Sequence, residues 1–458
     1  TNGHSIGLGR FDQYMYPFYQ KGIEDGTLTP ELAMEFIEEL YIKTTANPWF
    51  QSTGLAYYFG GYYRYPHIDV GGLDKNRRDA SNELSYLCLR AMRYVKTTAP
   101  TVSLLLHQKT PDDLLMEAIK LAAEGMGHPS FFNCESLYGM LDNRAGGLYG
   151  KSPYTMEQIL EWGSPIGCVE PGVMGYQYGH TDSCIINVAY APTLTLTRGI
   201  KPSNVEGYAS GELLSYDSGA LDQYDTFEDY YSAVKGQIEW AIKKAHSSAI
   251  IAEKILAEQF QLPTYTLLLR GALEKGVDAA AGGALCNVGP TIQVIGFGTL
   301  ADSVAAVKKV VFDDKEYILE DIKNAIETHF EGYEDMRMKL LAAPKYGNDD
   351  DYVDDYAADL WTFFANTTRS LKNYRGGYCD PAVQMVQAHI GFGAMTGATP
   401  NGRLAGEPLA DTMSATQQAD VHGPTYAARS YGKLDYPIYS NGTLLNMWIS
   451  GAELLGKK

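Results

Sequence analysis

The chain has 458 residues, of which 45% are hydrophobic, so it can fill a large core and is longer than one small domain. Its formal net charge of -18 would repel phosphate backbones and anionic membrane surfaces, which argues against nucleic acid and lipid as partners. A small molecule is the expected binding partner.

The cysteines indicate a reducing compartment because they form no C-x-x-C pair and no dense framework. No apolar run reaches the length of a membrane span, and no signal peptide is visible. We therefore expect a cytoplasmic protein without a membrane partner. The six cysteines are Cys88, Cys134, Cys168, Cys184, Cys286 and Cys379.

The first segment of the chain, T-N-G-H-S, has the residue types of a polar turn. Thr29–Pro30 predicts the start of a helix, since proline is favoured in the first helical turn. A second helix, buried, is expected from Leu84 to Tyr94 after a glycine-rich, charged loop. The apolar stripe expected on the first of these helices is Leu32, Phe36 and Leu40.

Three elements are expected before the centre of the chain. Thr110–Pro111 begins a helix, and Phe131–Cys134 predicts a short interior strand. Thr155 to Trp162 is expected to be a brief helix, with Thr155 and Gln158 forming a capping box. That helix should end at Gly163, directly before the segment with the most reactive side chains.

This central segment runs from Ser164 to Ser183 and reads S-P-I-G-C-V-E-P-G-V-M-G-Y-Q-Y-G-H-T-D-S. Side chains of extended chain alternate between two sides, so Cys168 and Glu170 would point the same way and Val169 the other. Its prolines and glycines predict a rigid loop that presents a thiol and a carboxyl to one pocket. Taken alone, C-x-E also fits a cysteine that simply packs in a core.

Beyond this loop, Cys184 to Leu196 is mostly apolar and β-branched, which predicts a buried strand. Thr226 is expected to cap a very long helix that reaches Leu262 and is stopped by Pro263. Thr264 to Lys275 predicts a further helix. Near the end, Asn441–Gly442 predicts a turn that feeds a strand over T-L-L-N-M-W-I.

A dinucleotide-binding unit is the main alternative that the motifs offer. Thr291–Ile295 predicts a strand, a G-F-G turn follows, and Ala301 to Phe312 has helical periodicity. Only two of the three fingerprint glycines are met, because Ala301 stands at the third position. We therefore favour an ordinary strand-to-helix turn.

Two other motifs fail on their composition. The acidic run Asp349–Asp355 lacks the glycine and the terminal glutamate of a calcium loop, so it predicts a solvated helix start. Gly391–Gly397 has no lysine after it and is not a phosphate loop. No metal site is expected.

Several ordered segments resemble the glycyl radical enzymes, the superfamily similar to pyruvate formate-lyase. G-C-V-E-P around Cys168 is similar to the thiyl-radical loop of that family. Several long matches in the same order are more specific than any single one of them. The other matching segments are Gly9–Tyr19, Asn82–Leu87, Lys345–Asp350 and Pro400–Asp411.

The resemblance implies an α/β fold, a barrel of two antiparallel half-barrels with helices outside and the cysteine loop inside. We expect residues 1–458 to form one incomplete domain of this barrel type. In such enzymes a stored glycyl radical, installed by a radical-SAM activating enzyme, generates the reactive sulfur radical. No cofactor bound directly to this chain is expected.

The same resemblance implies roles for individual residues. Cys168 would form the thiyl that takes hydrogen from substrate, and Glu170 would remove the adjacent hydroxyl proton. Asp182 matches an acidic position near the departing hydroxyl in glycerol and diol dehydratases, although it also fits a strand-start cap. Thr181 stands where those enzymes favour histidine. His4 and Ser5 look like the strand end that hydrogen-bonds a substrate hydroxyl.

One departure concerns the glycine that stores the radical, in an R-V-x-G-Y type loop. Arg375–Tyr378, R-G-G-Y, imitates it but is one residue short and lies before the P-N-G-R segment. We therefore expect this chain to be a piece of a longer or split enzyme, without the glycyl loop and the N-terminal region. Such a piece should be inactive alone, and the complete enzyme should form a homodimer.

The expected activity is a radical lyase that eliminates water or another leaving group from a small hydroxylated substrate. Gly167 precedes Cys168 where pyruvate formate-lyase needs a second cysteine. Arylacetate decarboxylase, choline-type C–N lyase and formate acetyltransferase-like chemistry remain alternatives, as does an inactive or nucleotide-binding barrel.

Overall fold

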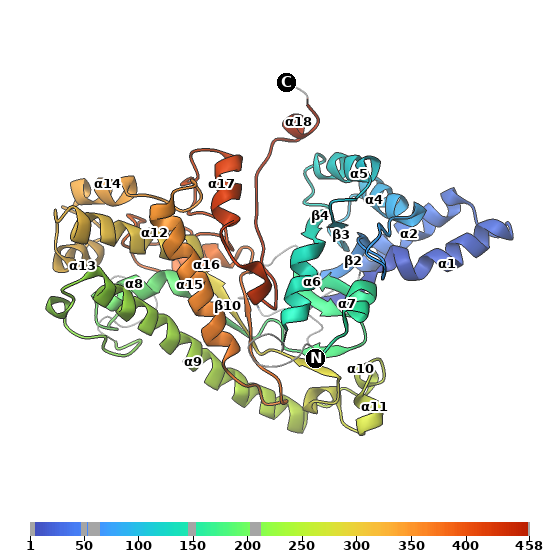
Figure 1. Ribbon diagram of the computed structural model, residues 1–458, viewed down its shortest axis with the longest axis horizontal. Coiled ribbons are helices and arrows are strands. Elements are labelled where there is room, and N and C mark those ends of the chain that lie inside the picture. The colour runs from blue at the N-terminus through green and yellow to red at the C-terminus, as the bar shows by residue number, and fades with distance from the viewer. Residues whose placement is uncertain (1–4, 47–52, 54–64, 145–152, 202–211, 457–458) are drawn as a thin grey trace.

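The computed structural model describes residues 5–46, 53, 65–144, 153–201 and 212–456. Figure 1 shows two lobes with a layer of short strands between them. The first lobe, blue to teal, holds the N-terminal sheet and its helices. The second lobe, green to orange, is mostly helical, and the C-terminal segment runs upward beside both.

The first lobe is built on a four-stranded parallel sheet in the order β1-β2-β3-β4. Parallel strands need crossover connections, and helices supply them here. The strands are β1 (Ser5–Arg10), β2 (Tyr65–Gly71), β3 (Thr101–Leu106) and β4 (Ser130–Asn133). The helices are α1 (Phe11–Glu24), α2 (Pro30–Thr45), α4 (Glu83–Val95) and α5 (Asp112–Ala122).

The sequence placed the start of α2 correctly but not its buried face. The Thr29 side chain accepts a hydrogen bond from the Leu32 backbone N–H and caps the helix, as Thr29–Pro30 predicts. Phe36 is 55% exposed, so the predicted stripe is wrong by one position. The buried residues of α2 are Ala33, Ile37 and Tyr41, which pack against α4 and the sheet.

Between the lobes lie two small sheets. The first is the antiparallel pair β5 (Gly163–Ile166) and β6 (Glu170–Val173), which follows α6 (Cys134–Asn143) and α7 (Met156–Trp162). The predicted capping box of Thr155 and Gln158 begins α7. The second is the parallel pair β7 (Gln177–Gly179) and β9 (Cys286–Val288).

A parallel sheet in the order β11-β10-β8 supports the second lobe, with β8 (Cys184–Asn187), β10 (Thr291–Ile295) and β11 (Asp380–Ala382). The strand predicted over Cys184–Leu196 is thus wrong beyond Asn187. A 3-10 turn follows, and α8 (Ala191–Leu196) has Pro192 in its first turn, where proline favours a helix.

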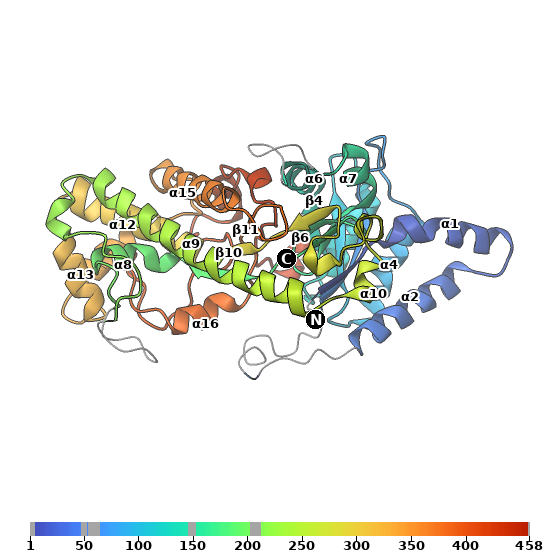
Figure 2. The same ribbon diagram turned by 90° about the horizontal axis from the view of Figure 1, so that it is seen from below.

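The longest helix, α9 (Phe227–Gln259), runs from the second lobe to the middle of the molecule, as Figures 1 and 2 show. Thr226 caps it as predicted, in a capping box with Asp229. The helix predicted over Thr264–Lys275 is broken into α10 (Pro263–Thr266) and α11 (Ala272–Lys275), because Gly271 between them has a φ of +88°.

The remaining elements complete the second lobe and the C-terminal segment. The helices are α12 (Phe297–Val307), the π-helical turn Lys308–Asp313, α13 (Leu319–Glu327), α14 (Glu334–Ala342), α15 (Asp351–Arg369), α16 (Ala388–Ala394), α17 (Pro424–Tyr431) and α18 (Gly451–Leu454). Short 3-10 turns occupy Leu221–Gln223, Ala279–Ala281 and Tyr436–Ile438.

The strand, glycine turn and helix predicted around Gly296 are present, and their packing explains the glycines. A Cβ on Gly296 would lie 2.7 Å from the Ala189 Cβ, and one on Gly298 would lie 2.5 Å from the Ser414 carbonyl oxygen. The Thr299 hydroxyl accepts a hydrogen bond from the Ala410 N–H. Because protein atoms fill the start of α12, these glycines serve close packing and not a phosphate.

Two other predicted elements differ from the structure. The acidic run begins α15 with Asp350 as its cap, but Asp354 is buried and contacts Lys433 at 2.8 Å, so this part of the run is not solvated. No strand forms over Thr443–Ile449; only an isolated bridge joins Thr443 to Val383, and Trp448 is fully exposed.

The sheets of the described residues are four separate units, and their closure into one barrel remains a prediction. The mixed α/β class and the parallel sheets are confirmed. Within the residues that the structure describes, no helix is both long and apolar enough to cross a membrane.

Candidate functional site

Cys168 lies at the tip of a tight hairpin. Ile166 and Glu170 are paired across β5 and β6, which leaves Gly167, Cys168 and Val169 in the turn. Gly167 has a φ of +64°, a conformation that glycine adopts without strain. The thiol is therefore presented by a turn of defined backbone, where the sequence predicted an extended loop.

The Glu170 carboxylate folds back onto this turn. Its Oε2 accepts hydrogen bonds from the backbone N–H of Cys168 at 2.9 Å and of Val169 at 3.0 Å. Burial and the nearby charge of Asp182 raise the pKa of Glu170 to about 7, although the backbone N–H groups act in the opposite direction. A carboxyl in this state can accept or donate a proton near neutral pH.

The Cys168 thiol is partly buried and stays protonated. Burial raises its pKa well above the ordinary value, and the charges of Glu170 and Asp182 raise it further. A nucleophilic cysteine needs a lowered pKa. This site therefore disfavours the thiolate and keeps the hydrogen on sulfur.

Asp182 joins the same electrostatic environment from the segment before β8. Its Oδ1 accepts a hydrogen bond of 2.6 Å from Nε2 of Gln293 on β10. Gln293 is fully buried, and its Oε1 has no hydrogen-bond partner among the described residues. An acid from the segment before β8 and an amide from β10 thus meet near the hairpin.

The structure describes the other predicted substrate-binding residues only in part. Thr181 contributes its carbonyl, which accepts a hydrogen bond of 2.8 Å from Asn441 Nδ2. Ser5 opens β1, but its side chain lies outside the described residues, as does all of His4. The structure therefore brings together Cys168, Glu170 and Asp182 and leaves the strand-end pair untested.

The C-terminal part of the chain buttresses the hairpin. A Cβ on Gly442 would lie 2.6 Å from the Val169 carbonyl oxygen, so the 441–442 turn packs directly on the turn of Cys168. Arg144, buried at the end of α6, donates to the Pro171 carbonyl at 2.6 Å and to Asn441 Oδ1 at 3.1 Å. These contacts join segments of the chain that lie about 270 residues apart in the sequence.

The R-G-G-Y segment belongs to a structural network. Arg375 Nη2 lies 2.7 Å from Glu253 Oε1 and donates to the Val288 carbonyl at 2.7 Å. His180 Nδ1 reaches the same Glu253 oxygen at 3.1 Å. Arg375 thus ties α9 to β9, which is a structural role for the first residue of this motif.

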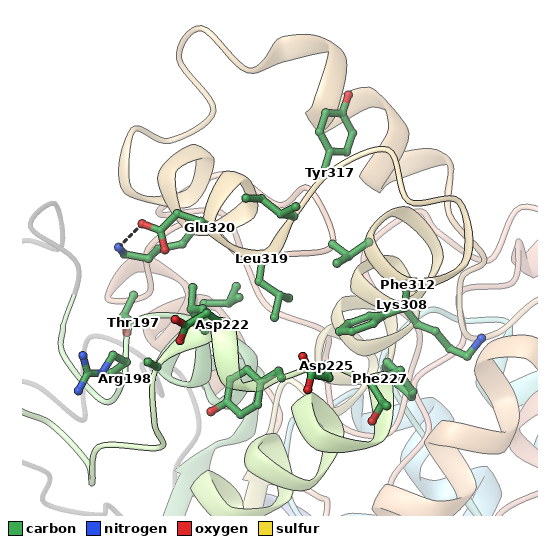
Figure 3. A pocket seen from close by; sticks show the side chains of 18 of the residues that line it. Thr197, Arg198, Asp222, Asp225, Phe227, Lys308, Phe312, Tyr317, Leu319 and Glu320 are labelled. Carbon is green, nitrogen blue, oxygen red and sulfur yellow. Dashed lines mark hydrogen bonds and ion pairs between the residues drawn. The ribbon is translucent and has the colours of Figure 1, made fainter.

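A wide pocket lies in the second lobe, among α8, α9, the π-helical turn and α13 (Figure 3). None of the predicted site residues lines it. Its charges pair locally: Lys308 lies 2.8 Å from Asp313, and Lys323 lies 2.8 Å from Glu320. We therefore place the chemistry at the hairpin.

Sequence reasoning missed Gln293 and a buried histidine on β2, His67, whose Nδ1 lies 2.9 Å from the Gly167 carbonyl oxygen. The available signal was a polar residue in the middle of an apolar strand, since such residues need a partner when buried.

The comparisons with known proteins agree with this geometry. Residues 1–393 match the family model described as pyruvate formate lyase-like. The chain is 31% identical to (2S)-3-sulfopropanediol dehydratase of Klebsiella oxytoca and to trans-4-hydroxy-L-proline dehydratase of Clostridioides difficile, over 98% of this chain and 53% and 55% of theirs. A solved structure on 1,2-propanediol dehydration in Roseburia inulinivorans superposes with a TM-score of 0.91 at 33% identity, over 97% of this chain and 55% of that one.

The chain spans about half the length of the curated relatives it matches. The family model, over residues 1–393, covers the hairpin of Cys168 and Glu170 and the three parallel sheets. The chain belongs to the pyruvate formate lyase-like family of glycyl radical enzymes.

Proposed function

We propose that this chain carries the thiyl hairpin of a glycyl radical lyase that acts on a small hydroxylated substrate. The observation that carries the proposal is the hairpin turn that presents Cys168, with the buried Glu170 carboxylate folded back onto the backbone N–H groups of Cys168 and Val169. The raised pKa values of both groups fit the roles proposed for them. Hydrogen-atom transfer needs an S–H group, and removal of a hydroxyl proton needs a base that is available near neutral pH.

The proposed cycle begins at the sulfur of Cys168. Cys168 gives its hydrogen atom to the stored radical and becomes a thiyl, which takes a hydrogen atom from a substrate carbon that bears a hydroxyl. The S–H bond reforms and the radical passes to carbon. Glu170 accepts the hydroxyl proton, so the electron-rich radical expels the leaving group of the neighbouring carbon with its bonding pair.

When the leaving group is hydroxide, it departs as water by taking up the proton that Glu170 accepted, and we propose that Asp182 assists this transfer. Cys168 then returns its hydrogen atom to the product radical, which restores the thiyl. The radical itself is supplied by a glycyl radical that a radical-SAM activating enzyme installs. We also propose that the complete enzyme is a homodimer.

The substrate class follows from the site and the relatives together. Asp182, Gln293 and Thr181 offer polar atoms next to the hairpin. The two dehydratases named above act on a sulfonated diol and a hydroxylated proline, and the solved structure concerns 1,2-propanediol. We propose a vicinal diol or a comparable hydroxylated compound with a leaving group on the adjacent carbon, with His4 and Ser5 as further binding residues.

The test is turnover in a reconstituted system that contains this chain, the activating enzyme and the segment that bears the radical, with a panel of diols and hydroxyproline. Cys168→Ala and Glu170→Gln should each abolish turnover. Cys88→Ala is the control, because Cys88 is buried in the first lobe. Turnover that survives Cys168→Ala would overturn the proposal.

A further inference from the structure

His67 lies directly behind the reactive hairpin and is fully buried in β2. Its Nδ1 is 2.9 Å from the carbonyl oxygen of Gly167, the residue before Cys168. Its Nε2 is 2.5 Å from Ser103 Oγ on β3 and 3.3 Å from Oδ1 of Asp69. Two strands of the first lobe, β2 and β3, and the hairpin therefore converge on this ring.

The contacts of the ring fix one of its protons. A carbonyl oxygen only accepts, so Nδ1 carries a hydrogen. Nε2 can accept from the Ser103 hydroxyl when the ring is neutral, and when protonated it lies 3.3 Å from Asp69 Oδ1, which accepts when ionised. With a hydrogen on both nitrogens the ring is an imidazolium, and a buried charge of this kind needs a counter-charge, which Asp69 provides.

The charged groups around the ring support this state. Burial alone would lower the pKa of His67, but the Asp69 carboxylate, the Gly167 carbonyl and the charge of Glu170 together raise it. Burial raises the pKa of Asp69, and the charges of His67 and of Arg10 on β1 act in the opposite direction; the Arg10 guanidinium also donates to the carbonyls of Gly71 and Leu73. His128, before β4, is the remaining titratable neighbour, and burial lowers its pKa to about 4, which leaves it neutral.

The carbonyl that His67 contacts and the N–H that Glu170 contacts belong to the same peptide group. The peptide between Gly167 and Cys168 accepts from His67 through its oxygen and donates to Glu170 Oε2 through its nitrogen at 2.9 Å. A donor on the carbonyl polarises the peptide and strengthens the hydrogen bond made by its N–H. The imidazolium and the carboxylate are thus linked through one peptide plane.

We propose that His67 is a positioning residue for Cys168, which clamps the Gly167–Cys168 peptide from behind and, through that peptide, favours the ionised form of Glu170. Asp69 and Ser103 hold the ring in place. The catalytic consequence rests on the proposed function, whereas the clamp itself is a property of the folded chain.

The clamp can be measured without turnover, by hydrogen exchange of the Cys168 amide in the whole chain. His67→Leu removes the donor, and loss of a hydrogen bond from a charged group should speed exchange of this amide about tenfold to hundredfold. His67→Asn keeps an N–H near the place of Nδ1 and should retain most of the protection. His246→Leu, at a half-buried histidine of α9 whose Nε2 lies 2.8 Å from the Lys372 carbonyl oxygen, is the control and should change nothing at the hairpin.

The pH dependence distinguishes positioning from simple packing. When the pH rises through the raised pKa of His67, the Nε2 proton is lost, and Nδ1–H remains on the Gly167 carbonyl as a neutral donor, which makes a weaker hydrogen bond than a charged one. Protection of the Cys168 amide, corrected for intrinsic exchange, should therefore fall in that step for the wild type and stay flat for His67→Asn.

Several outcomes would overturn the clamp. These are unchanged local exchange in His67→Leu, equal exchange in His67→Leu and His67→Asn, or a pH step that persists in His67→Asn. If His67→Leu does not fold, Asp69→Asn tests the clamp instead. This variant keeps the ring but removes the counter-charge, so the pH at which protection of the Cys168 amide falls should decrease. An unchanged pH for this step would refute the clamp. Turnover that survives Cys168→Ala would refute the proposed function and leave these exchange results standing.

Discussion

The raised pKa of Glu170, which suits it to accept a proton, also lowers the stability of the folded chain at neutral pH. Its pKa is about 7 in the folded chain and near 4.5 when the chain is unfolded. Between these values the native state binds more protons than the unfolded state, so the stability contributed at this site falls as the pH rises from about 4.5 to about 7.

Glu170→Gln should remove that penalty and keep an oxygen to accept the two N–H groups. At pH 8 we expect the free energy of unfolding to rise by about 3 kcal/mol, with little change at pH 4, because each pKa unit corresponds to about 1.4 kcal/mol. Urea unfolding at both pH values measures this. Equal effects of the substitution at both pH values would contradict it.

Gly167 sets the backbone of the same turn. Gly167→Ala should cost about 1 to 2 kcal/mol, since an L-residue is strained at its φ of +64°. Gly276→Ala is a matched control, with a φ of +63° in open space after α11. Both should lower the melting temperature similarly, but only Gly167→Ala should alter alkylation of Cys168, followed by peptide mass spectrometry. Unchanged alkylation would show that the turn does not govern the thiol.

At the scale of elements, the hairpin of β5 and β6 depends on an arginine from α6. Arg144 is buried, donates to Pro171 and Asn441, and lies 3.5 Å from Asp380 Oδ1. Arg144→Met leaves these acceptors unpaired and should destabilise the chain by about 3 to 5 kcal/mol in urea unfolding.

Arg198→Met is the comparison for this change, because the ion pair of Arg198 with Asp217 is half exposed and should leave the unfolding midpoint unchanged. Equal midpoint shifts for the two variants would contradict the special role of Arg144.

The elements that the sequence predicted well carry local signals. The caps Thr29, Thr155 and Thr226 each bind the first turn of their own helix, so a few neighbouring residues decide the start. The predictions that were wrong concern segments whose structure depends on contacts with residues far away in the sequence. The apolar run after Cys184 divides between strand and helix according to its packing against α9 and α12, and Thr443–Ile449 finds no neighbouring strand with which to pair beyond one bridge.

At the scale of the whole molecule, the site joins segments that no local pattern connects. Cys168 and Glu170 are two residues apart, and their meeting could be predicted from the motif. Gln293 reaches Asp182 across 111 positions because β10 pairs with β8, and His67 reaches Gly167 across 100 because the β5–β6 hairpin packs on β1 and β2. The sequence predicted the α/β class, but it could not predict this pairing.

The central claim is that Cys168 sulfur relays a hydrogen atom between two substrate carbons. The most direct test is turnover, in the reconstituted system, of an accepted diol that carries deuterium only on the carbon from which hydrogen is taken. We expect the deuterium to leave that carbon and to reappear on the carbon that lost its hydroxyl, and we expect turnover to be slower than with the unlabelled diol. Product that keeps all deuterium on its original carbon, formed at an unchanged rate, would contradict it.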